Sequence, residues 1–127
     1  MKAYLVSRYK GPMQVGEVAE PAIDDRDVLV DVHAAGVNML DAKIRYGEFK
    51  LFLPYKAPFL LGHDLAGVVT RVGTAVTRFT VGDEVYARPR DGRIGTFAER
   101  IAVDQDDLAI KPANLSMAEA ASLPWSP

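Results

Sequence analysis

The sequence has 127 residues, of which 49% are hydrophobic and 25% are charged, values typical of a single soluble globular domain. Its formal net charge of −2 argues against nucleic acid or an acidic membrane surface as a partner. The lack of cysteine excludes disulfides, a thiol nucleophile and cysteine-ligated zinc within these residues. Because no apolar run can span a bilayer and the first residues lack the apolar core of a secretory signal, we expect a cytoplasmic protein.

Strands are predicted in the first quarter of the chain over residues 3–6, 14–18 and 28–33. The third is the clearest, because Val28, Val30 and Val32 alternate with other residues at period two, as in a half-buried strand. A charged turn at 24–27 precedes it. A short helix is expected over 38–46, ended by Gly47. Residues 49–60 are apolar but interrupted by prolines, which predicts an ordered loop.

Two strongly bent strands are predicted over 65–72 and 84–88. Gly62, Gly67 and Gly73 stand close together in a β-branched background, and glycine within a strand marks a bulge, a bend or a close backbone approach. Gly82-Asp83 is typical of a turn between the two strands.

The last third begins with three arginines at 88–93, which we interpret as a solvated hairpin tip. Strands follow over 97–103 and 108–111. Ser116 and Glu119 have the spacing of a capping box, so a helix should begin near Met117. Many short strands separated by turn residues favour a mainly β fold, a barrel or sandwich with a few short helices.

The glycines and polar residues of this chain, taken in order and spacing, resemble a known family. They are Gly36-Val37-Asn38, Asp41, Arg45, Gly47, Leu61-Gly62-His63-Asp64, Gly67, Gly73, Gly82-Asp83-Glu84-Val85 and Gly95-Thr96-Phe97-Ala98-Glu99. The pattern resembles the N-terminal half of the medium-chain dehydrogenase/reductase superfamily, and in particular its zinc-independent quinone oxidoreductases. The run 41–50 is similar to that of members that reduce enones and alkenals.

The resemblance implies a GroES-like, partly open β-barrel over residues 1–127 that supplies the substrate side of an active-site cleft. In the family, a Rossmann domain follows and binds NADP(H). This sequence contains no Gly-x-Gly-x-x-Gly motif for a dinucleotide. We therefore expect a substrate-binding domain, truncated before its cofactor domain, that alone neither binds NADPH tightly nor turns over.

The resemblance and the residue chemistry together predict seven site residues. Asn38 and Lys43 are assigned catalytic roles, and Asp41, Tyr46, Phe49, Phe52 and His63 are assigned substrate contacts. The Asn38 amide can donate and accept hydrogen bonds, and it can equally serve as a helix N-cap. A Lys43 ammonium would stabilise an enolate oxygen, although it can equally lie on a solvated helix face.

His63 has two readings as well: direct substrate contact, or local hydrogen bonds that fix the entry to a strand. Zinc-dependent relatives place a cysteine at the position of Asn38 and a histidine at that of His63. Because a catalytic zinc needs three protein ligands, we expect no metal.

The expected ligand is a conjugated carbonyl or a quinone. Surface that a cofactor domain would otherwise cover can favour a homo-oligomer. The alternative function is a non-catalytic β-barrel module that self-associates or pairs with another chain.

Overall fold

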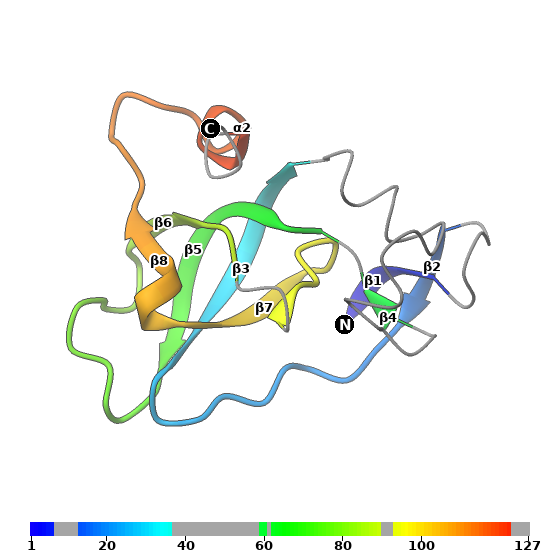
Figure 1. Cartoon of the computed structure of the whole chain (residues 1–127), viewed down its shortest axis with the longest axis horizontal. Helices are drawn as coiled ribbons and strands as arrows, with labels where there is room; N and C mark the ends of the chain where they lie inside the picture. The colour runs from blue at the N-terminus through cyan, green and yellow to red at the C-terminus, as the bar shows by residue number, and fades with distance from the viewer. Residues whose placement is uncertain (7–12, 37–58, 61, 90–92, 123–127) are drawn as a thin grey trace, which may run out of the picture.

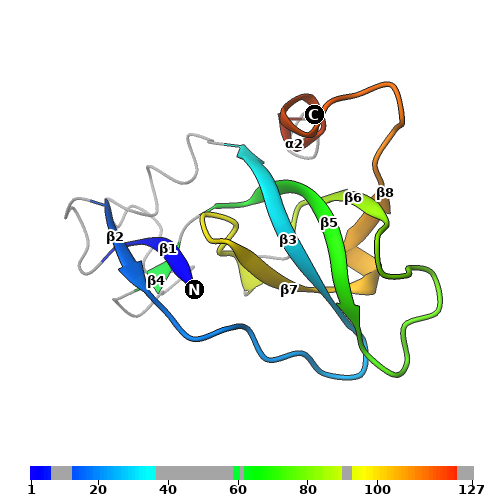
Figure 2. The same ribbon diagram turned by 180° about the vertical axis from the view of Figure 1, so that it is seen from behind.

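The computed structural model describes residues 1–6, 13–36, 59–60, 62–89 and 93–122. Within them, the chain forms two antiparallel sheets and a short C-terminal helix, so the prediction of a mainly β fold is confirmed. Figures 1 and 2 show the smaller sheet beside the larger one, with the helix over one end of the larger sheet. No helix in this described part has the length and apolar character needed to cross a membrane.

The smaller sheet has the strand order β2-β1-β4. Its strands are β1 (Lys2–Val6), β2 (Met13–Glu17) and β4 (Phe59–Leu60). The amide of Tyr4 donates to the Phe97 carbonyl at 2.9 Å, and Ala3 forms a bridge with Ala98. These two contacts join the smaller sheet to the segment that leads into the larger one.

The larger sheet has the order β7-β3-β5-β6-β8. Its strands are β3 (Asp27–Gly36), β5 (Asp64–Val72), β6 (Glu84–Ala87), β7 (Arg100–Asp104) and β8 (Leu108–Ile110), and the 3-10 turn η2 (Gln105–Asp107) joins β7 to β8. The core holds one apolar cluster drawn from every one of these strands. Its buried members are Val28, Val30, Leu65, Val69, Phe79, Val85, Ala87, Ile101, Val103 and Leu108.

The long pair β3–β5 is bent by two bulges, which confirms the bending predicted for residues 65–72. The register passes from Leu29–Arg71 to Val30–Val69, so Thr70 is an extra residue on β5. A second shift inserts His33 into β3. At Gly67 a Cβ would collide with the carbonyl oxygen of Asp31, so the approach of the two backbones requires glycine.

The helix α2 (Met117–Ser122) begins where the capping box predicts. The Ser116 amide donates to the Glu119 carboxylate at 2.9 Å, and the Glu119 amide donates to Ser116 Oγ at 3.1 Å. The pKa of the Glu119 carboxylate is lowered, chiefly by the hydrogen bond that it accepts from the Ser116 backbone. The reciprocal bonds satisfy two backbone donors that the helix start would otherwise leave open.

Three predicted boundaries are wrong. The strand expected over 28–33 extends over Asp27–Gly36. The strand expected over 97–103 is observed only over Arg100–Asp104, because the segment 97–99 turns aside to bond with β1. Residues 59–60, expected in a loop, pair with Leu5 and Val6 of β1. The helix expected over 38–46, most of the loop after it and residues 90–92 of the arginine tip lie outside the described residues.

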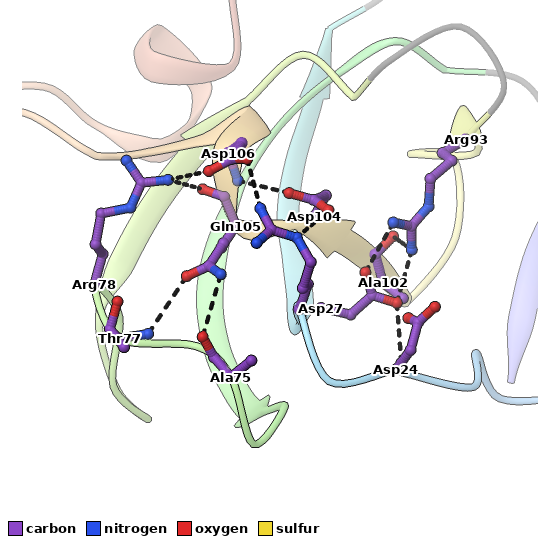
Figure 3. A network of polar contacts seen from close by, with 11 residues as sticks. Asp24, Asp27, Ala75, Thr77, Arg78, Arg93, Ala102, Asp104, Gln105 and Asp106 are labelled. Carbon is purple, nitrogen blue, oxygen red and sulfur yellow. Dashed lines mark hydrogen bonds and ion pairs between the residues drawn. The ribbon is translucent and has the colours of Figure 1, made fainter.

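The interpretation of Arg93 as part of a solvated tip is also wrong. Its guanidinium makes a bidentate ion pair with Asp27, at 2.8 and 2.9 Å, and donates to the Ala102 carbonyl at 3.3 Å. Asp27 is 2% exposed and opens β3. Figure 3 shows this pair beside Asp24. The arginine therefore ties the 93–96 segment to the first residues of β3 and to β7.

Candidate functional site

Only one of the seven predicted site residues lies in the described part of the chain. It is His63, which immediately precedes β5. The other six fall in the segment 37–58, outside the described residues: Asn38, Asp41, Lys43, Tyr46, Phe49 and Phe52. Their roles remain predictions, and the structure bears on the site through the residues that surround this segment.

His63 and Asp64 are both buried at the start of β5, with 0% and 1% of their surface exposed. The preceding Gly62 has a φ of 110°, a left-handed conformation that favours glycine. A side chain there would strike Thr96 Oγ1 and the Phe97 ring. Gly62 thus lets two segments approach closely around the buried histidine.

Backbone hydrogen bonds lock these two segments together. The Gly62 carbonyl accepts from the amide of Gly95 at 3.0 Å and from the amide of Thr96 at 3.3 Å. Thr96 is 0% exposed. It is the third buried polar residue in this region, after His63 and Asp64. Thr96 belongs to the Gly95–Glu99 run that carries the family resemblance, but no feature of the sequence assigns it to the site.

The end of β3 lies against the same site. Gly36, its last residue, pairs with Asp64, and the segment that carries Asn38 and Lys43 follows directly in the sequence. A Cβ on Gly36 would stand 3.2 Å from Asp64 Cβ and 2.8 Å from the Ala121 carbonyl oxygen of α2. The start of β5, the end of β3 and the last turn of α2 therefore meet at one end of the sheet.

An apolar hollow of about 450 Å³ adjoins this end of the sheet. It lies between the two sheets, and its walls are mostly carbon. The lining residues are Lys2, Ala3, Tyr4, Val15, Val32, Ala35, Phe97, Ala98 and Glu99. Phe97 connects it to the buried polar group, because its ring also lies against Gly62. Its size is within the range of small-molecule sites in proteins.

His63 presents no surface to solvent in this arrangement. Buried polar groups are usually held by hydrogen bonds within the protein, so the burial supports the reading in which His63 fixes the entry to β5. Direct contact between His63 and a substrate stays a prediction. Among the described residues, no three histidine, aspartate or glutamate side chains gather as a metal site. Asn38 lies outside them, so the expectation of no metal also stays a prediction.

A first charged cluster lies at the opposite end of β3. Two hydrogen bonds from Arg93 lower the pKa of Asp27 to about 2, although burial acts in the other direction. The pKa of Asp24 is raised, chiefly by its hydrogen bond with Asp27. This carboxyl pair and its arginine hold β3, β7 and the 93–96 segment together, away from the buried histidine.

A second charged cluster surrounds η2 (Figure 3). Asp106 accepts from Arg26 at 2.5 Å and from Arg78 at 2.6 Å, while the buried Gln105 side chain bonds the backbone of Ala75 and Thr77. Asp104 caps the turn by accepting from the Asp106 amide. These bonds hold the 75–78 loop onto η2, so this end of the sheet is structural.

The chain matches the family model "Alcohol dehydrogenase GroES-like domain" over residues 24–113. It is 40% identical, over 98% of its length, to an NADPH-dependent alkenal/one oxidoreductase, chloroplastic, of Arabidopsis thaliana, of which it covers 34%. It is 37% identical, over 85% of its length, to a quinone-oxidoreductase homolog, chloroplastic, of Spinacia oleracea, of which it covers 33%. The chain therefore spans about a third of the length of the curated relatives it matches.

A crystal structure of an alcohol dehydrogenase superfamily protein from Novosphingobium aromaticivorans has the same fold. The two superpose with a TM-score of 0.92 at 42% identity, over 98% of this chain and 38% of the other. The fold is thus shared with that protein, and the sequence similarity extends to the two curated relatives. The chain belongs to the alcohol dehydrogenase GroES-like domain family, the N-terminal part of the medium-chain dehydrogenase/reductase superfamily.

Proposed function

We propose that this chain is the substrate-binding domain of an NADPH-dependent oxidoreductase that reduces quinones or α,β-unsaturated carbonyls by hydride transfer. The observation that carries the proposal is the apolar hollow between the sheets, which Phe97 joins to Gly62 and the buried His63. A flat conjugated molecule can bury its carbon skeleton in such a hollow while its oxygen forms hydrogen bonds with a few polar groups at one edge. The printed names of the relatives, an alkenal/one and a quinone oxidoreductase, agree with that chemistry.

Asn38 and Lys43 are the proposed polar groups. The strand that leads to them ends at Gly36, opposite Asp64, one residue after Ala35, which lines the hollow. An amide at position 38 can hold a carbonyl without adding charge. A lysine ammonium would stabilise the negative charge that builds on oxygen as the conjugated carbon accepts hydride. Asp41, Tyr46, Phe49 and Phe52 are proposed to complete the substrate contacts.

The described residues do not fit a dinucleotide. Their paired strands are antiparallel, whereas the usual phosphate site follows a parallel strand and opens a helix through a glycine-rich turn. We therefore assign to this chain the carbonyl side of the reaction only. We also propose zinc-independent chemistry, because Asn38 offers an amide where zinc-dependent relatives have a thiolate ligand.

Calorimetric titration of the chain with menadione, a quinone, and separately with NADPH tests the proposal. We expect saturable menadione binding that Asn38→Ala weakens about tenfold, the loss of one well-placed hydrogen bond. Asp25→Ala, at an exposed turn away from the hollow, is the control and should bind like the parent. NADPH should show no saturation in the micromolar range. Absence of menadione binding, or equal affinity in the Asn38 variant, would rule out the proposal.

The second candidate function is self-association without catalysis. It draws on Tyr4 and Val15, paired across β1 and β2 and 54% and 61% exposed. Exposed apolar pairs of this kind favour contact between proteins. Light scattering across a concentration series separates the two candidates, because self-association predicts a rising mass that Tyr4→Ser and Val15→Ser abolish. A constant monomer mass would dismiss it.

A further inference from the structure

Lys111 is a buried lysine whose role is not explained by the barrel core. It follows β8, and only 7% of its surface is exposed. Its ammonium donates to the carbonyls of Leu115 and Pro112, at 2.5 and 3.1 Å, and lies 3.2 Å from the Glu84 carboxylate on β6. The three acceptors match the three donors of an ammonium, which offsets the cost of burying the charge.

The two carbonyls belong to the turn that leads into α2. The Leu115 amide closes this turn by donating to the Pro112 carbonyl at 3.2 Å, and Ser116 then caps the helix. The backbone of Lys111 is itself fixed, since its amide donates to the Glu84 carbonyl at 2.9 Å. Lys111 thus connects the start of α2 to β6 from a backbone position that cannot shift freely.

Small residues let α2 lie close to the strands. Ala120 and Ala121 are 0% and 2% exposed and pack with the buried Ala66 of β5. The last turn of the helix reaches Gly36, where a Cβ would stand 2.8 Å from the Ala121 carbonyl. Figures 1 and 2 both show α2 over this end of β3. The distance of α2 from the sheet therefore affects the position of the Gly36–Asp64 pair.

We infer that Lys111 is a positioning residue for the candidate site. By holding the 112–115 turn against β6, it sets α2 on Gly36 and Asp64 and so fixes where β3 ends beside His63. It touches no substrate and acts through the helix. The inference extends the proposed function, because the ligand whose binding it governs is the conjugated carbonyl or quinone proposed above.

Amide hydrogen exchange and ¹⁵N–¹H spectra of the full 127-residue chain, with and without menadione, test the inference. In Lys111→Met, the exchange rate of the α2 amides should rise about tenfold more than that of the β7 amides. A rise confined to α2 indicates local opening of the helix and not global unfolding. The amides of Gly36 and Asp64 should shift, and menadione affinity should fall about tenfold as the site loosens. Arg71→Met, which replaces an exposed cation on β5, is the control and should change neither.

Two further variants separate positioning from general stability. Lys111→Arg keeps the charge and several donors, so it should restore most of the menadione affinity. Glu84→Gln keeps an acceptor near the ammonium and leaves both carbonyl bonds in place. It can lower overall stability by removing the counter-charge, but exchange in α2 relative to β7 and the signals of Gly36 and Asp64 should match those of the parent chain. Uniformly faster exchange throughout Lys111→Met, or unchanged signals at α2, Gly36 and Asp64, would overturn the inference.

Gly36→Ala decides the case if Lys111→Met does not fold. Its new Cβ would stand 2.8 Å from the Ala121 carbonyl oxygen. With Lys111 intact, this variant should therefore still displace α2 and shift the amide signals of Asp64 and Ala121. Unmoved α2 signals in this variant would contradict the inference. Failure of the parent chain to bind menadione would refute the proposed function alone, since the exchange readout needs no ligand.

Discussion

Single charged residues differ widely in what they contribute to this domain, and burial decides the difference. The Arg93–Asp27 pair joins a guanidinium that is 32% exposed to a carboxylate that is 3% exposed. In contrast, Arg78 and Asp106 are each 57% exposed, and water screens such pairs effectively. Although both pairs have short contacts, only the first leaves a buried charge behind when one partner is removed.

Arg93→Met should therefore lower the free energy of unfolding by about 3 kcal/mol, because it strands the Asp27 carboxylate in the protein. Arg78→Met is the matched substitution at the exposed pair, and it should cost about 0.5 kcal/mol. Urea unfolding followed by circular dichroism measures both. Equal losses in the two variants would show that burial of Asp27 does not govern the energy.

The same pair predicts that the domain loses stability in acid, below about pH 4. Folding lowers the pKa of Asp27 from 3.8 to about 2, so its ionised form is favoured in the native state. Its contribution is complete above the unfolded pKa and disappears as the pH falls from about 4 toward 2, a loss of about 2 kcal/mol. The raised pKa of Asp24 has the opposite effect on stability. Folding disfavours the ionised form of Asp24, so its protonation at low pH favours the folded domain.

Urea midpoints measured between pH 5 and about pH 2 test this loss of stability in acid. In Asp27→Asn the fall over this interval should be flatter than in the parent chain. Asp25→Asn, at the exposed neighbouring position, should keep the parent's slope. An Asp27→Asn curve parallel to the parent's would mean that other carboxyl groups cause the loss of stability.

At the scale of elements, the bulged pair β3–β5 shapes the whole larger sheet. Its bend depends on Gly67, where the backbone of β3 passes too close to admit a side chain. Gly67→Ala should cost about 3 kcal/mol, because the obstacle is the Asp31 backbone and cannot turn away. Gly82→Ala meets no atom within 4 Å and only opposes a φ of 96°, so about 1 kcal/mol is expected. Thermal unfolding of both variants checks the ranking, and an equal loss would contradict it.

Elements with a local cause could be predicted from the sequence. The strand at 28–33, the glycines of β5 and the Ser116–Glu119 box each have a cause within a few residues, and the structure has all three. The half-buried pattern expected of the strand is not observed, because Asp27–Val30 are all buried. Arg93 could not be placed, because its partner Asp27 lies 66 residues away. The early part of the strand expected over 97–103 failed for the same reason, since its partners are in β1.

The candidate site was predictable only in part. His63 and Gly62 stand out in the sequence as possible site residues. Thr96 stands out only as part of a family motif and Lys111 not at all, because their importance comes from burial and from contacts made across the fold. The roles of Asn38, Asp41, Lys43, Tyr46, Phe49 and Phe52 came from family resemblance and remain predictions. Local sequence rules identify turns and caps, whereas a site at the junction of β3, β5 and α2 requires the tertiary structure.

For the molecule as a whole, the two ends of the larger sheet have separate tasks. One end carries the ion pairs of Asp27 and η2, which hold strands and loops together. The other brings Gly36, His63, Thr96 and α2 together, and Phe97 connects this group to the apolar hollow. The chain spans about a third of its curated relatives' length, and the hollow end is where we propose that a conjugated carbonyl binds.

Mapping of menadione binding by ¹⁵N–¹H spectroscopy shows at which end of the sheet the ligand binds. We expect saturable shifts confined to amides of the hollow and its neighbours, namely Val32, Ala35, Gly62, His63 and Phe97. The amides of Val72, Val103 and Gln105, at the Asp27 end, should stay unchanged. Spectra that do not move on titration, or shifts centred on η2 and the Asp27 end of β3, would contradict the proposed binding site.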